Sequence, residues 1–333
     1  MILIVTGQYA GAQYIYPLIK KWSVNKTTKW NIVAKGASCK FWDKVNIKYT
    51  KIVNISSQEV SEYLELMRPN LIITSTSLNY NFEALYINEG KKKKIPTASF
   101  IDFWSNYLIR FKFKKELIYP DNIFAIDLNC LMEMINEGVP EKLIKIVGQP
   151  YLEQIIGSDY KIGDKILFAG QPLEKFFKKN LGYNEEDFWK ICFQVINKKK
   201  LKKILCTNHP EAINFSVSDG YNNIISEGQG LNDILDCHTV LGISSMQIFI
   251  GYLLGRKVAS IQPKIKNQDI FPLSRWGLVP RLETVEDIIN FIENNDNQFD
   301  NFQNKNDRSS EVDQFQLNGS LERLELFCLN YEN

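Results

Sequence analysis

The chain has 333 residues, 44% of them hydrophobic, and a formal net charge of +2 at pH 7. This length predicts two domains, and the hydrophobic content is sufficient for two cores. The small net charge does not indicate nucleic acid as a partner, and no apolar stretch reaches the ~20 residues that cross a membrane.

The cysteines and the first residues of the chain bear on metal binding and on the cellular compartment. The six cysteines form no C-x-x-C pair and the chain has only two histidines, so we expect no metal site. Cys130, Cys192 and Cys206 stand in apolar surroundings, which is typical of reduced core residues. The short apolar run Ile2–Val5 predicts a strand rather than a secretory signal. We therefore expect a cytoplasmic protein, and peripheral contact with the inner face of a membrane through lysines stays open.

Short apolar runs alternate with helical patterns along the first half of the chain, which is typical of a parallel sheet with crossover helices. Residues 1–157 therefore predict one Rossmann-like domain. Its expected strands are Ile2–Thr6, Asn31–Ala34, Lys51–Ile55, Leu71–Thr74, Pro96–Ile101, Asn122–Ile126 and Leu143–Val147. Its expected helices are Gln13–Trp22, a helix from the capping box Ser56-x-x-Glu59 to about Met67, Phe82–Asn88 and Leu131–Glu137.

The same alternation restarts after the polar stretch Ser158–Asp164, so residues 158–318 predict a second Rossmann-like domain. Its expected strands are Lys165–Ala169, Lys203–Cys206, Asn223–Ser226, Thr239–Gly242 and Lys257–Ile261. Its expected helices are Glu185–Asn197, Leu231–Asp236, Met246–Leu254 and Val285–Asn294. Asn295–Asp313 predicts a loop, and residues 319–333 contain a helix, Ser320–Leu329, that we expect to pack back across the domains.

In open parallel sheets, ligands bind outside the carboxyl ends of the strands, and several polar clusters of this chain fall there. The first cluster follows the strand Ile2–Thr6 and contains Gly7, Gln8 and Gly11. Glycines let a backbone approach a ligand closely, and the following helix start presents free N–H groups. We expect this loop to face the acceptor or the reacting centre, and a simple strand-to-helix turn is the alternative.

The second cluster follows the expected strand Pro96–Ile101 and contains Asp102, Trp104 and Arg110. A carboxylate flanked by aromatic residues at a strand end would be partly desolvated, which makes it a better base. Asp102 is therefore the candidate general base, and Arg110 could bind an anionic substrate or pair with Asp102. A helix N-cap is the alternative role for Asp102.

Three further clusters lie in the second half. His209 and Glu211 follow the strand Lys203–Cys206, where His209 could donate to a phosphate and Glu211 could orient it or bind ribose hydroxyls. Gly242, Ser244 and Ser245 open a helix whose N–H groups and hydroxyls would bind an anion without a metal, although a plain serine cap would look the same. The loop with Gly228 and Gly230 could approach a nucleobase or ribose.

The stretch Ile234–Pro263 resembles the nucleotide-binding half of GT-B glycosyltransferases. It contains a helix ending near Asp236, a strand to Gly242, the pair Ser244-Ser245 and an apolar helix ending in Gly255-Arg256-Lys257. This pattern is similar to the donor half of the CDP-glycerol phosphotransferase, lipid A disaccharide synthase and UDP-GlcNAc 2-epimerase groups. The resemblance implies a GT-B fold, with an N-terminal acceptor domain and a C-terminal nucleotide-sugar donor domain facing a central cleft.

The pair His209-Pro210 resembles the HP motif of bacterial sialyltransferases and polysialyltransferases, in which the histidine contacts the CMP donor. The resemblance implies that His209 is catalytic and favours a CMP-linked over a UDP-linked donor. Those families take their general base from an acidic-acidic-glycine motif that this chain lacks, and Asp102 is the best positional candidate.

The predicted function is transfer of a sugar, for instance a sialic-acid-like nonulosonate, from a CMP-activated donor to a glycan or lipid-linked glycan acceptor. Such a reaction would serve the synthesis of surface polysaccharide, capsule or lipopolysaccharide. No DxD-type motif stands out, so we expect a metal-independent reaction without a cofactor. A UDP-sugar 2-epimerase or nucleotide-sugar hydrolase of the same fold is one alternative, and a GT-B-like protein that binds without catalysis is another. The sequence does not predict the oligomeric state.

Overall fold

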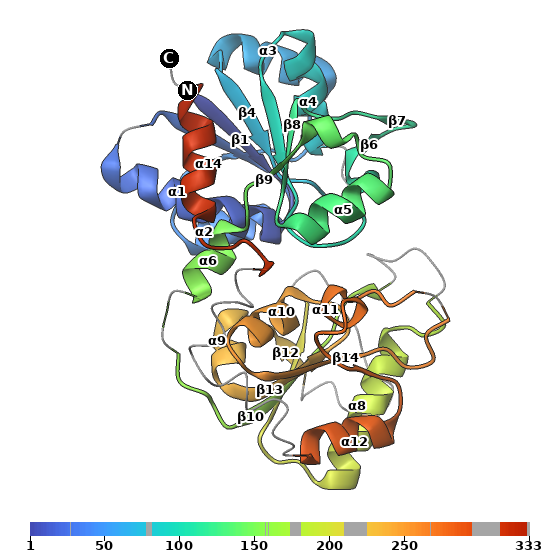
Figure 1. Cartoon of the computed structure of the whole chain (residues 1–333). Helices are drawn as coiled ribbons and strands as arrows, with labels where there is room; N and C mark the ends of the chain where they lie inside the picture. Colours follow the sequence, from blue (N-terminus) through green and yellow to red (C-terminus); the bar gives the residue numbers. More distant parts are fainter. Residues whose placement is uncertain are drawn as a thin grey trace. The chain divides into compact units, whose positions relative to one another are not determined.

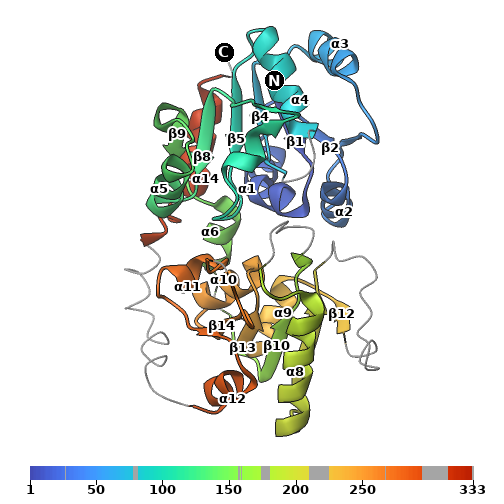
Figure 2. The same ribbon diagram turned by 90° about the vertical axis from the view of Figure 1, so that its right-hand side faces the viewer.

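The computed structural model describes residues 1–26, 28–77, 82–156, 158, 160–173, 181–209, 225–266, 268–294 and 314–331. The chain forms two compact units. Unit 1 comprises Met1–Gly157 and Ser310–Asn333, and unit 2 comprises Ser158–Ser309. Each unit contains its own parallel sheet with helices packed against it (Figures 1 and 2).

Unit 1 is built on a seven-stranded sheet. Its strands are β1 (Ile2–Thr6), β2 (Trp30–Ala34), β3 (Thr50–Lys51), β4 (Leu71–Thr74), β5 (Thr97–Phe100), β8 (Asn122–Ala125) and β9 (Ile144–Ile146). They pair in parallel in the order β3-β2-β1-β4-β5-β8-β9. The chain adds β2 and β3 on one side of β1 and then crosses to the other side for β4. The strand order therefore reverses between β1 and β4, the place where ligands bind in open sheets of this kind.

Helices cover both faces of the unit 1 sheet. They are α1 (Tyr9–Asn25), α2 (Ala37–Lys44), α3 (Ser57–Met67), α4 (Phe82–Lys92), α5 (Leu128–Asn136), α6 (Pro150–Ile156) and α14 (Ser320–Leu329), with the 3₁₀ turns η1 (Leu108–Phe111) and η2 (Glu141–Leu143). Successive side chains of a strand point to opposite faces, so Ile2 and Ile4 of β1 pack with α1, α2 and α14. Leu3 and Val5 pack with α3 and α4 on the other face. A short antiparallel hairpin, β6 (Lys112–Phe113) with β7 (Glu116–Leu117), completes the unit (Figure 1).

Unit 2 repeats this plan with a six-stranded sheet. Its strands are β10 (Lys165–Ala169), β11 (Ile204–Asn208), β12 (Ile225–Glu227), β13 (Cys237–Gly242), β14 (Lys257–Ile261) and β15 (Arg281–Leu282). They pair in parallel in the order β12-β11-β10-β13-β14-β15. The order reverses between β10 and β13, so these two strands correspond to β1 and β4 of unit 1.

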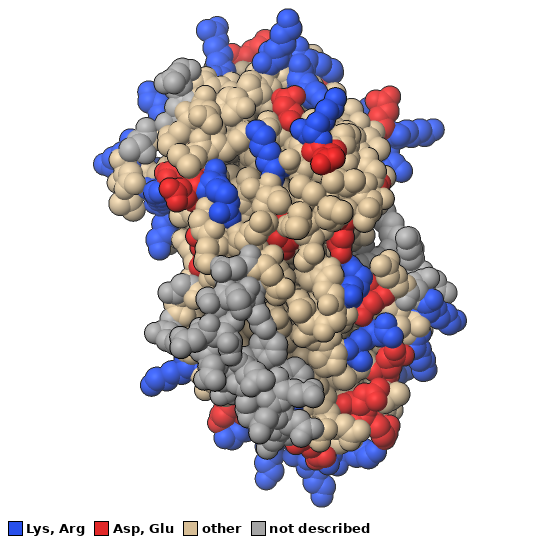
Figure 3. All heavy atoms as spheres, viewed as in Figure 1, with Lys and Arg blue, Asp and Glu red and all other residues tan. Residues whose placement is uncertain are grey.

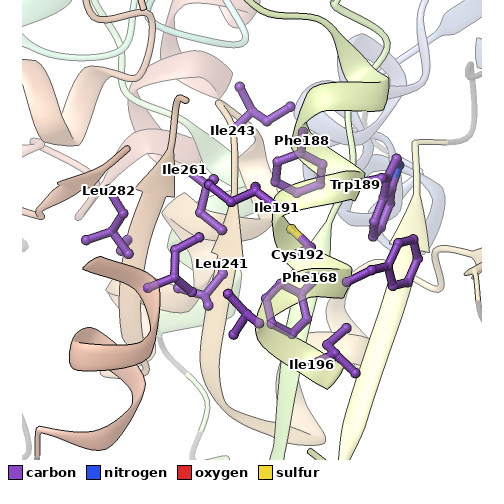
Figure 4. Close-up of a cluster of buried hydrophobic side chains, with 14 of the residues drawn as sticks. Phe168, Phe188, Trp189, Ile191, Cys192, Ile196, Leu241, Ile243, Ile261 and Leu282 are labelled. Carbon is purple, nitrogen blue, oxygen red and sulfur yellow. The ribbon is translucent and has the colours of Figure 1, made fainter. Parts of the chain in front are cut away.

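The helices of unit 2 also lie on both faces of its sheet. They are α8 (Glu185–Lys199), α9 (Leu231–Leu235), α10 (Met246–Leu253), α11 (Pro272–Arg275) and α12 (Val285–Glu293). Figure 4 shows Phe168 and Leu241 of the sheet beside Phe188 and Cys192 of α8, in a core that α12 also joins. On the opposite face, Gly251 of α10 lies directly against β13 and β14.

The α/β class with two parallel sheets is confirmed, and many expected elements have the observed bounds to within a few residues. The capping box of α3 is also confirmed, since Ser56 accepts from the Glu59 N–H and Glu59 accepts from the Ser56 N–H. Two expected elements have other bounds: α1 begins at Tyr9, four residues early, so Gly11 is helical, and the strand Lys51–Ile55 is reduced to β3. Several short elements were not expected, namely α2, the β6–β7 hairpin, α6, α11 and β15.

The C-terminal helix α14 belongs to unit 1, although all of unit 2, Ser158–Ser309, precedes it in the chain. It packs against α1 and α6, and Figure 1 shows it in red beside α1. Arg323 donates to Val147 O at 3.0 Å, and Glu153 accepts from the N–H groups of Gly319 and Leu321 at 2.6 and 2.8 Å. These bonds tie the end of the chain to the connection between β9 and α6. The loop predicted over Asn295–Asp313 lies outside the described residues.

Two sequence expectations concern surface and compartment. Among the described helices, none combines the length and apolar character that a bilayer crossing needs. Cys130, Cys192 and Cys206 are buried, as expected, and form no disulfide. On the face shown in Figure 3, Lys and Arg side chains are interspersed with Asp and Glu.

Candidate functional site

In unit 2, the loops after β10 and β13 meet where the strand order reverses. The backbone N–H of Ser244, two residues after β13, donates to Oε1 of Gln171 at 3.0 Å. The Ser244 hydroxyl donates to Ile270 O, also at 3.0 Å. Ser244 and Gln171 are both buried, so these bonds fix the loop that enters α10.

Ser245 occupies the N-cap position of α10 but its hydroxyl does not cap the helix. An N-cap serine ordinarily accepts a hydrogen bond from an N–H of the first turn. Here the side chain is 8% exposed, and its Oγ has no hydrogen-bond partner among the described residues. The first N–H groups of a helix have no partner within the helix and carry the positive end of its dipole. A phosphate oxygen placed there would satisfy both the N–H groups and the buried hydroxyl.

The ends of β11 and β12 lie side by side at the same edge. His209 is half-buried and directly follows β11, where its backbone N–H donates to Oδ1 of Asn208 at 3.1 Å. The backbone N–H of Gly228, directly after β12, donates to Asn208 O at 3.3 Å. The structure therefore brings His209 and Gly228 to neighbouring strand ends. Glu211 lies outside the described residues.

Gly228 also connects this corner to α10. A Cβ on Gly228 would lie 3.6 Å from both Oδ2 of Asp233 and Nε2 of Gln247, which is in the first turn of α10. Asp233 accepts from the backbone N–H of Gln229 at 2.5 Å, and burial raises the pKa of its carboxyl. Gly230, the N-cap of α9, has φ +69°, a positive value that favours glycine.

Gly242 has a packing role that the sequence did not indicate. A Cβ at this position would lie 2.7 Å from Ala169 O and 3.0 Å from Cδ1 of Ile248. The absence of a side chain therefore allows β13, β10 and α10 to approach one another, whether or not a ligand is bound.

In unit 1, the corresponding edge contains a buried carboxyl group, Glu83, in the first turn of α4. Its Oε1 accepts from the hydroxyls of Ser75 and Ser77, both at 2.6 Å, and from the backbone N–H of Gly7 at 3.1 Å. Gly7 follows β1 and Ser75 follows β4, so the cluster spans the reversal point of the sheet. The carboxyl group is fully buried, and Oε2 has no partner among the described residues. Burial raises the pKa of Glu83 to about 7, and the hydrogen bonds to Oε1 offset part of that effect.

The polar side chains around Glu83 explain why positions 7 and 11 are glycines. A Cβ on Gly7 would lie 2.6 Å from Oγ of Ser77 and 2.8 Å from Oε1 of Glu83. A Cβ on Gly11 would lie 2.4 Å from Cβ of Ser75. Gly11 is buried within α1, so its expected role in a ligand-binding loop is corrected to packing. Gln8 is partly exposed at the N-cap of α1, and its side chain makes no capping bond.

Asp102 and Arg110, the second predicted cluster, form a buried ion pair. Nη1 of Arg110 donates to Oδ1 of Asp102 at 2.7 Å, and Arg110 is 8% exposed and Asp102 4%. Nη1 also lies 3.0 Å from Thr76 O and 3.1 Å from Thr76 Oγ1, while Nε donates to Ser105 O at 3.0 Å. The next helical turn, η1, has Tyr107 at its N-cap, so the alternative role of Asp102 as a helix cap is wrong.

Trp104 supports this region from inside the core. The residue is fully buried, and its Nε1 donates to Oδ2 of Asp127 at 2.8 Å. Asp127 caps α5 by accepting from the Cys130 N–H at 2.7 Å, and burial raises the pKa of its carboxyl to about 7. Trp104, which the sequence placed in one cluster with Asp102, is therefore a core residue.

Four polar residues of these edges were missed by the sequence reasoning: Gln171, Asp233, Gln247 and Glu83. Gln171 stands in Gly170-Gln171-Pro172 directly after a predicted strand, a signal of the same kind as those that were used. Glu83 carries no comparable signal, because a glutamate is common in the first turn of a helix. Within the described residues, no group of three or more His, Cys, Asp or Glu could hold a metal ion.

Neither a protein-family model nor a curated protein sequence matches the chain. Solved structures do resemble it. The UDP-GlcNAc 2-epimerase from Neisseria meningitidis, bound to UDP-GlcNAc, has a TM-score of 0.65 at 13% identity, and the match covers 99% of each chain. HepE from Anabaena, in complex with UDP and glucose, has a TM-score of 0.55 at 11% identity over 97% of this chain and 95% of its own. The spinosyn rhamnosyltransferase SpnG has a TM-score of 0.54 at 11% identity over 98% of this chain and 100% of its own.

At these identities the likeness shows the fold. The chain therefore has the expected GT-B fold of two Rossmann-like units, which the solved structures use for nucleotide-sugar epimerisation and for glycosyl transfer.

Proposed function

We propose that the chain is a metal-independent glycosyltransferase that moves a sugar from a nucleotide-linked donor to a glycan acceptor. The observation that carries this proposal is the unpartnered, buried hydroxyl of Ser245 at the start of α10. A hydroxyl buried without a partner costs free energy, which a bound phosphate would recover.

Unit 2 takes the donor in this proposal. The Ser245 hydroxyl and the first N–H groups of α10 hold the phosphate next to the sugar, and Gln171 keeps the loop in place through Ser244. His209, at the end of β11, donates to the phosphate as it leaves. The edge between Gly228 and Asp233 accepts the nucleoside, because a glycine has no side chain to keep a ligand away from the backbone.

Unit 1 activates the acceptor. The acceptor oxygen attacks the anomeric carbon while the bond from that carbon to the donor phosphate breaks. The proton of the acceptor hydroxyl passes to the Asp102 carboxylate, and the electron pair of the broken bond stays on the phosphate. Proton loss must accompany attack, since a hydroxyl is far less acidic than a carboxyl group. His209, Ser245 and the N-terminus of α10 stabilise the charge that develops on the leaving phosphate.

Two observations point to different donors. The pair His209-Pro210 resembles the motif of enzymes with a CMP-linked donor and favours a sialic-acid-like sugar, whereas two of the similar structures hold UDP-GlcNAc or UDP. The number of epimerases among the similar structures also favours 2-epimerisation of a UDP-sugar as the second candidate reaction.

Calorimetry with CMP and UDP tests the donor site, and His238 provides a matched control for His209. His238 is exposed near the amino end of β13, away from the carboxyl edge. We expect one of the two nucleotides to bind. Ser245→Ala and His209→Ala should raise its Kd about tenfold or more, because each variant loses a hydrogen bond to a charged group. His238→Ala should bind as the wild type does. Absence of binding, or an equal loss in His238→Ala, would overturn the donor site.

Product analysis then separates the reactions. The wild type is incubated with CMP-N-acetylneuraminic acid or UDP-GlcNAc, with and without an acceptor. A transferase releases the nucleotide only when the acceptor is present, whereas a hydrolase releases it in both cases. A 2-epimerase converts UDP-GlcNAc into its manno isomer without needing an acceptor.

A further inference from the structure

Glu83 is a buried carboxyl group that the proposed reaction does not use. Three donors converge on Oε1, namely the Gly7 N–H and the hydroxyls of Ser75 and Ser77, while Oε2 has no partner among the described residues. An ordinary structural carboxylate in a protein interior is paired with a cation or accepts at both oxygens. This arrangement therefore needs an explanation beyond helix formation.

The three residues Ser75, Thr76 and Ser77 follow β4 and are held from two directions. Glu83 accepts hydrogen bonds from the hydroxyls of Ser75 and Ser77. Arg110 donates to the carbonyl oxygen and to the hydroxyl oxygen of Thr76. The Thr76 hydroxyl in turn donates to Phe100 O at 3.1 Å. The same Nη1 of Arg110 holds Asp102. The segment 75–77 thus links Glu83 to the Asp102–Arg110 pair across the ends of β4 and β5.

Packing leaves this segment little freedom to adjust. Gly7 and Gly11 have no room for a Cβ because Ser75, Ser77 and Glu83 press against them. Ser75, Thr76 and Ser77 are all buried. A change at Glu83 is therefore transmitted through the segment rather than absorbed by empty space.

We propose that Glu83 is a positioning residue: through Ser75–Ser77 it fixes the Asp102–Arg110 pair in the geometry in which Asp102 accepts the acceptor proton. This proposal rests on the function proposed above. Positioning matters because a displacement of ~1 Å at a reacting group can lower a rate about 100-fold.

The variants Glu83→Ala and Glu83→Gln separate positioning from the mere presence of a side chain. Alanine leaves the hydroxyls of Ser75 and Ser77 without their acceptor and the Gly7 N–H with only Oγ of Ser75, at 3.2 Å, whereas glutamine keeps an oxygen in the place of Oε1. Glu89 is the matched control, since it lies on the same helix, is 5% exposed and pairs with Lys92 rather than with the sheet edge. Glu89→Ala and Glu89→Gln are therefore made alongside.

The first measurement is hydrogen exchange, followed by mass spectrometry of peptides that cover residues 75–77 and 102–111. We expect Glu83→Ala to speed exchange by about tenfold or more in both segments. Residues 75–77 lose the acceptor of two hydroxyls, and residues 102–111 then depend on a Thr76 that is no longer fixed. Glu83→Gln should stay near the wild type, and the Glu89 variants should change neither segment. If Glu83→Ala changes residues 75–77 but leaves 102–111 unchanged, the link to Asp102 is refuted.

The second measurement compares turnover with donor binding, using nucleotide release from CMP-N-acetylneuraminic acid and UDP-GlcNAc in the presence of an added glycan acceptor. We expect Glu83→Ala to lower kcat by about tenfold or more while the Kd for the free nucleotide, bound by unit 2, does not change. Glu83→Gln should retain most of kcat. A parallel loss of kcat and nucleotide affinity, or an unchanged kcat, contradicts positioning. If the wild type releases no nucleotide from either donor, the proposed function fails, and the exchange experiment still decides whether Glu83 fixes the Asp102 segment.

Discussion

Glu83 and Arg110 hold alternate residues of one three-residue segment. Oε1 of Glu83 accepts from the hydroxyls of Ser75 and Ser77 at 2.6 Å, and Nη1 of Arg110 donates to Thr76 O, between them, at 3.0 Å. The two residues come from different elements, α4 and η1, and both bind the loop after β4. The carboxyl edge of unit 1 is therefore one connected polar network rather than a set of separate side chains.

Breaking the buried ion pair should strongly destabilise unit 1. Asp102→Ala leaves Arg110 buried with its charge uncompensated, and we expect the free energy of unfolding to fall by about 3–5 kcal/mol. Asp102→Asn keeps an acceptor for Arg110 and should cost less. Urea unfolding measures both. The exposed pair Lys93–Glu65 is the control, and Glu65→Ala should have little effect because solvent screens that pair. Equal effects of Asp102→Ala and Glu65→Ala would contradict the expected role of burial.

The stability of the fold should depend on pH through Glu83. In the unfolded chain this carboxyl group loses its proton near its ordinary pKa of 4.5, whereas in the folded protein it keeps the proton up to about pH 7. Between these values the folded state binds more protons, so the free energy of unfolding decreases as pH rises, by up to about 3 kcal/mol. The contribution is fully present below pH 4.5 and is lost above about pH 7.

Glu83→Gln isolates this effect, because glutamine resembles the protonated acid and does not titrate. The variant should match the wild type near pH 4 and become more stable than the wild type toward pH 8, measured as the difference in urea unfolding. Asp127, whose pKa burial also raises to about 7, titrates with the same sign in both proteins and cancels in the comparison. Parallel pH profiles of the two proteins would show that Glu83 does not titrate in this range.

The space around Gly7 should tolerate no side chain. Gly7→Ala places a Cβ 2.6 Å from Oγ of Ser77 and 2.8 Å from Oε1 of Glu83, and we expect a loss of about 1–3 kcal/mol of unfolding free energy. Gly228→Ala is the control in unit 2, since its nearest neighbour, Asn208 O, would lie at 3.4 Å, an ordinary contact. Thermal or urea unfolding measures the stability of both variants. A Gly7→Ala variant as stable as the wild type would mean that Ser77 and Glu83 can move aside at little cost.

The C-terminal helix should be required for the stability of unit 1. Leu324 is fully buried in the same core as Ile2 and Ile4, and Leu324→Ala should cost about 2–5 kcal/mol. Leu326, two residues on, is 56% exposed, and Leu326→Ala should change the unfolding free energy by less than about 0.5 kcal/mol. Similar values for the two variants would show that α14 contributes little to the core.

Local patterns in the sequence were sufficient for much of the fold. The strands β1, β10 and β14 and the helix α14 have the bounds that their apolar runs predict, and the capping box of α3 is formed by the expected pair. Elements with few residues or weak periodicity were missed. α2 buries only one side of two turns, and the β6–β7 hairpin has two residues in each strand, so neither leaves a repeated pattern.

The sequence by itself determined where strands end, and hence that Ser244, Ser245, His209 and Asp102 would stand at the carboxyl edges of two parallel sheets. Only the tertiary structure decided that Asp102 pairs with Arg110, that the Ser245 hydroxyl is buried without a partner, and that Glu83 closes a polar cluster with Gly7 and the Ser75–Ser77 segment. The physical reason is the range of the interactions. Periodicity and capping depend on residues a few positions apart, whereas Gly7 and Glu83 are separated by 76 residues and meet because β1 and β4 are neighbours in the sheet.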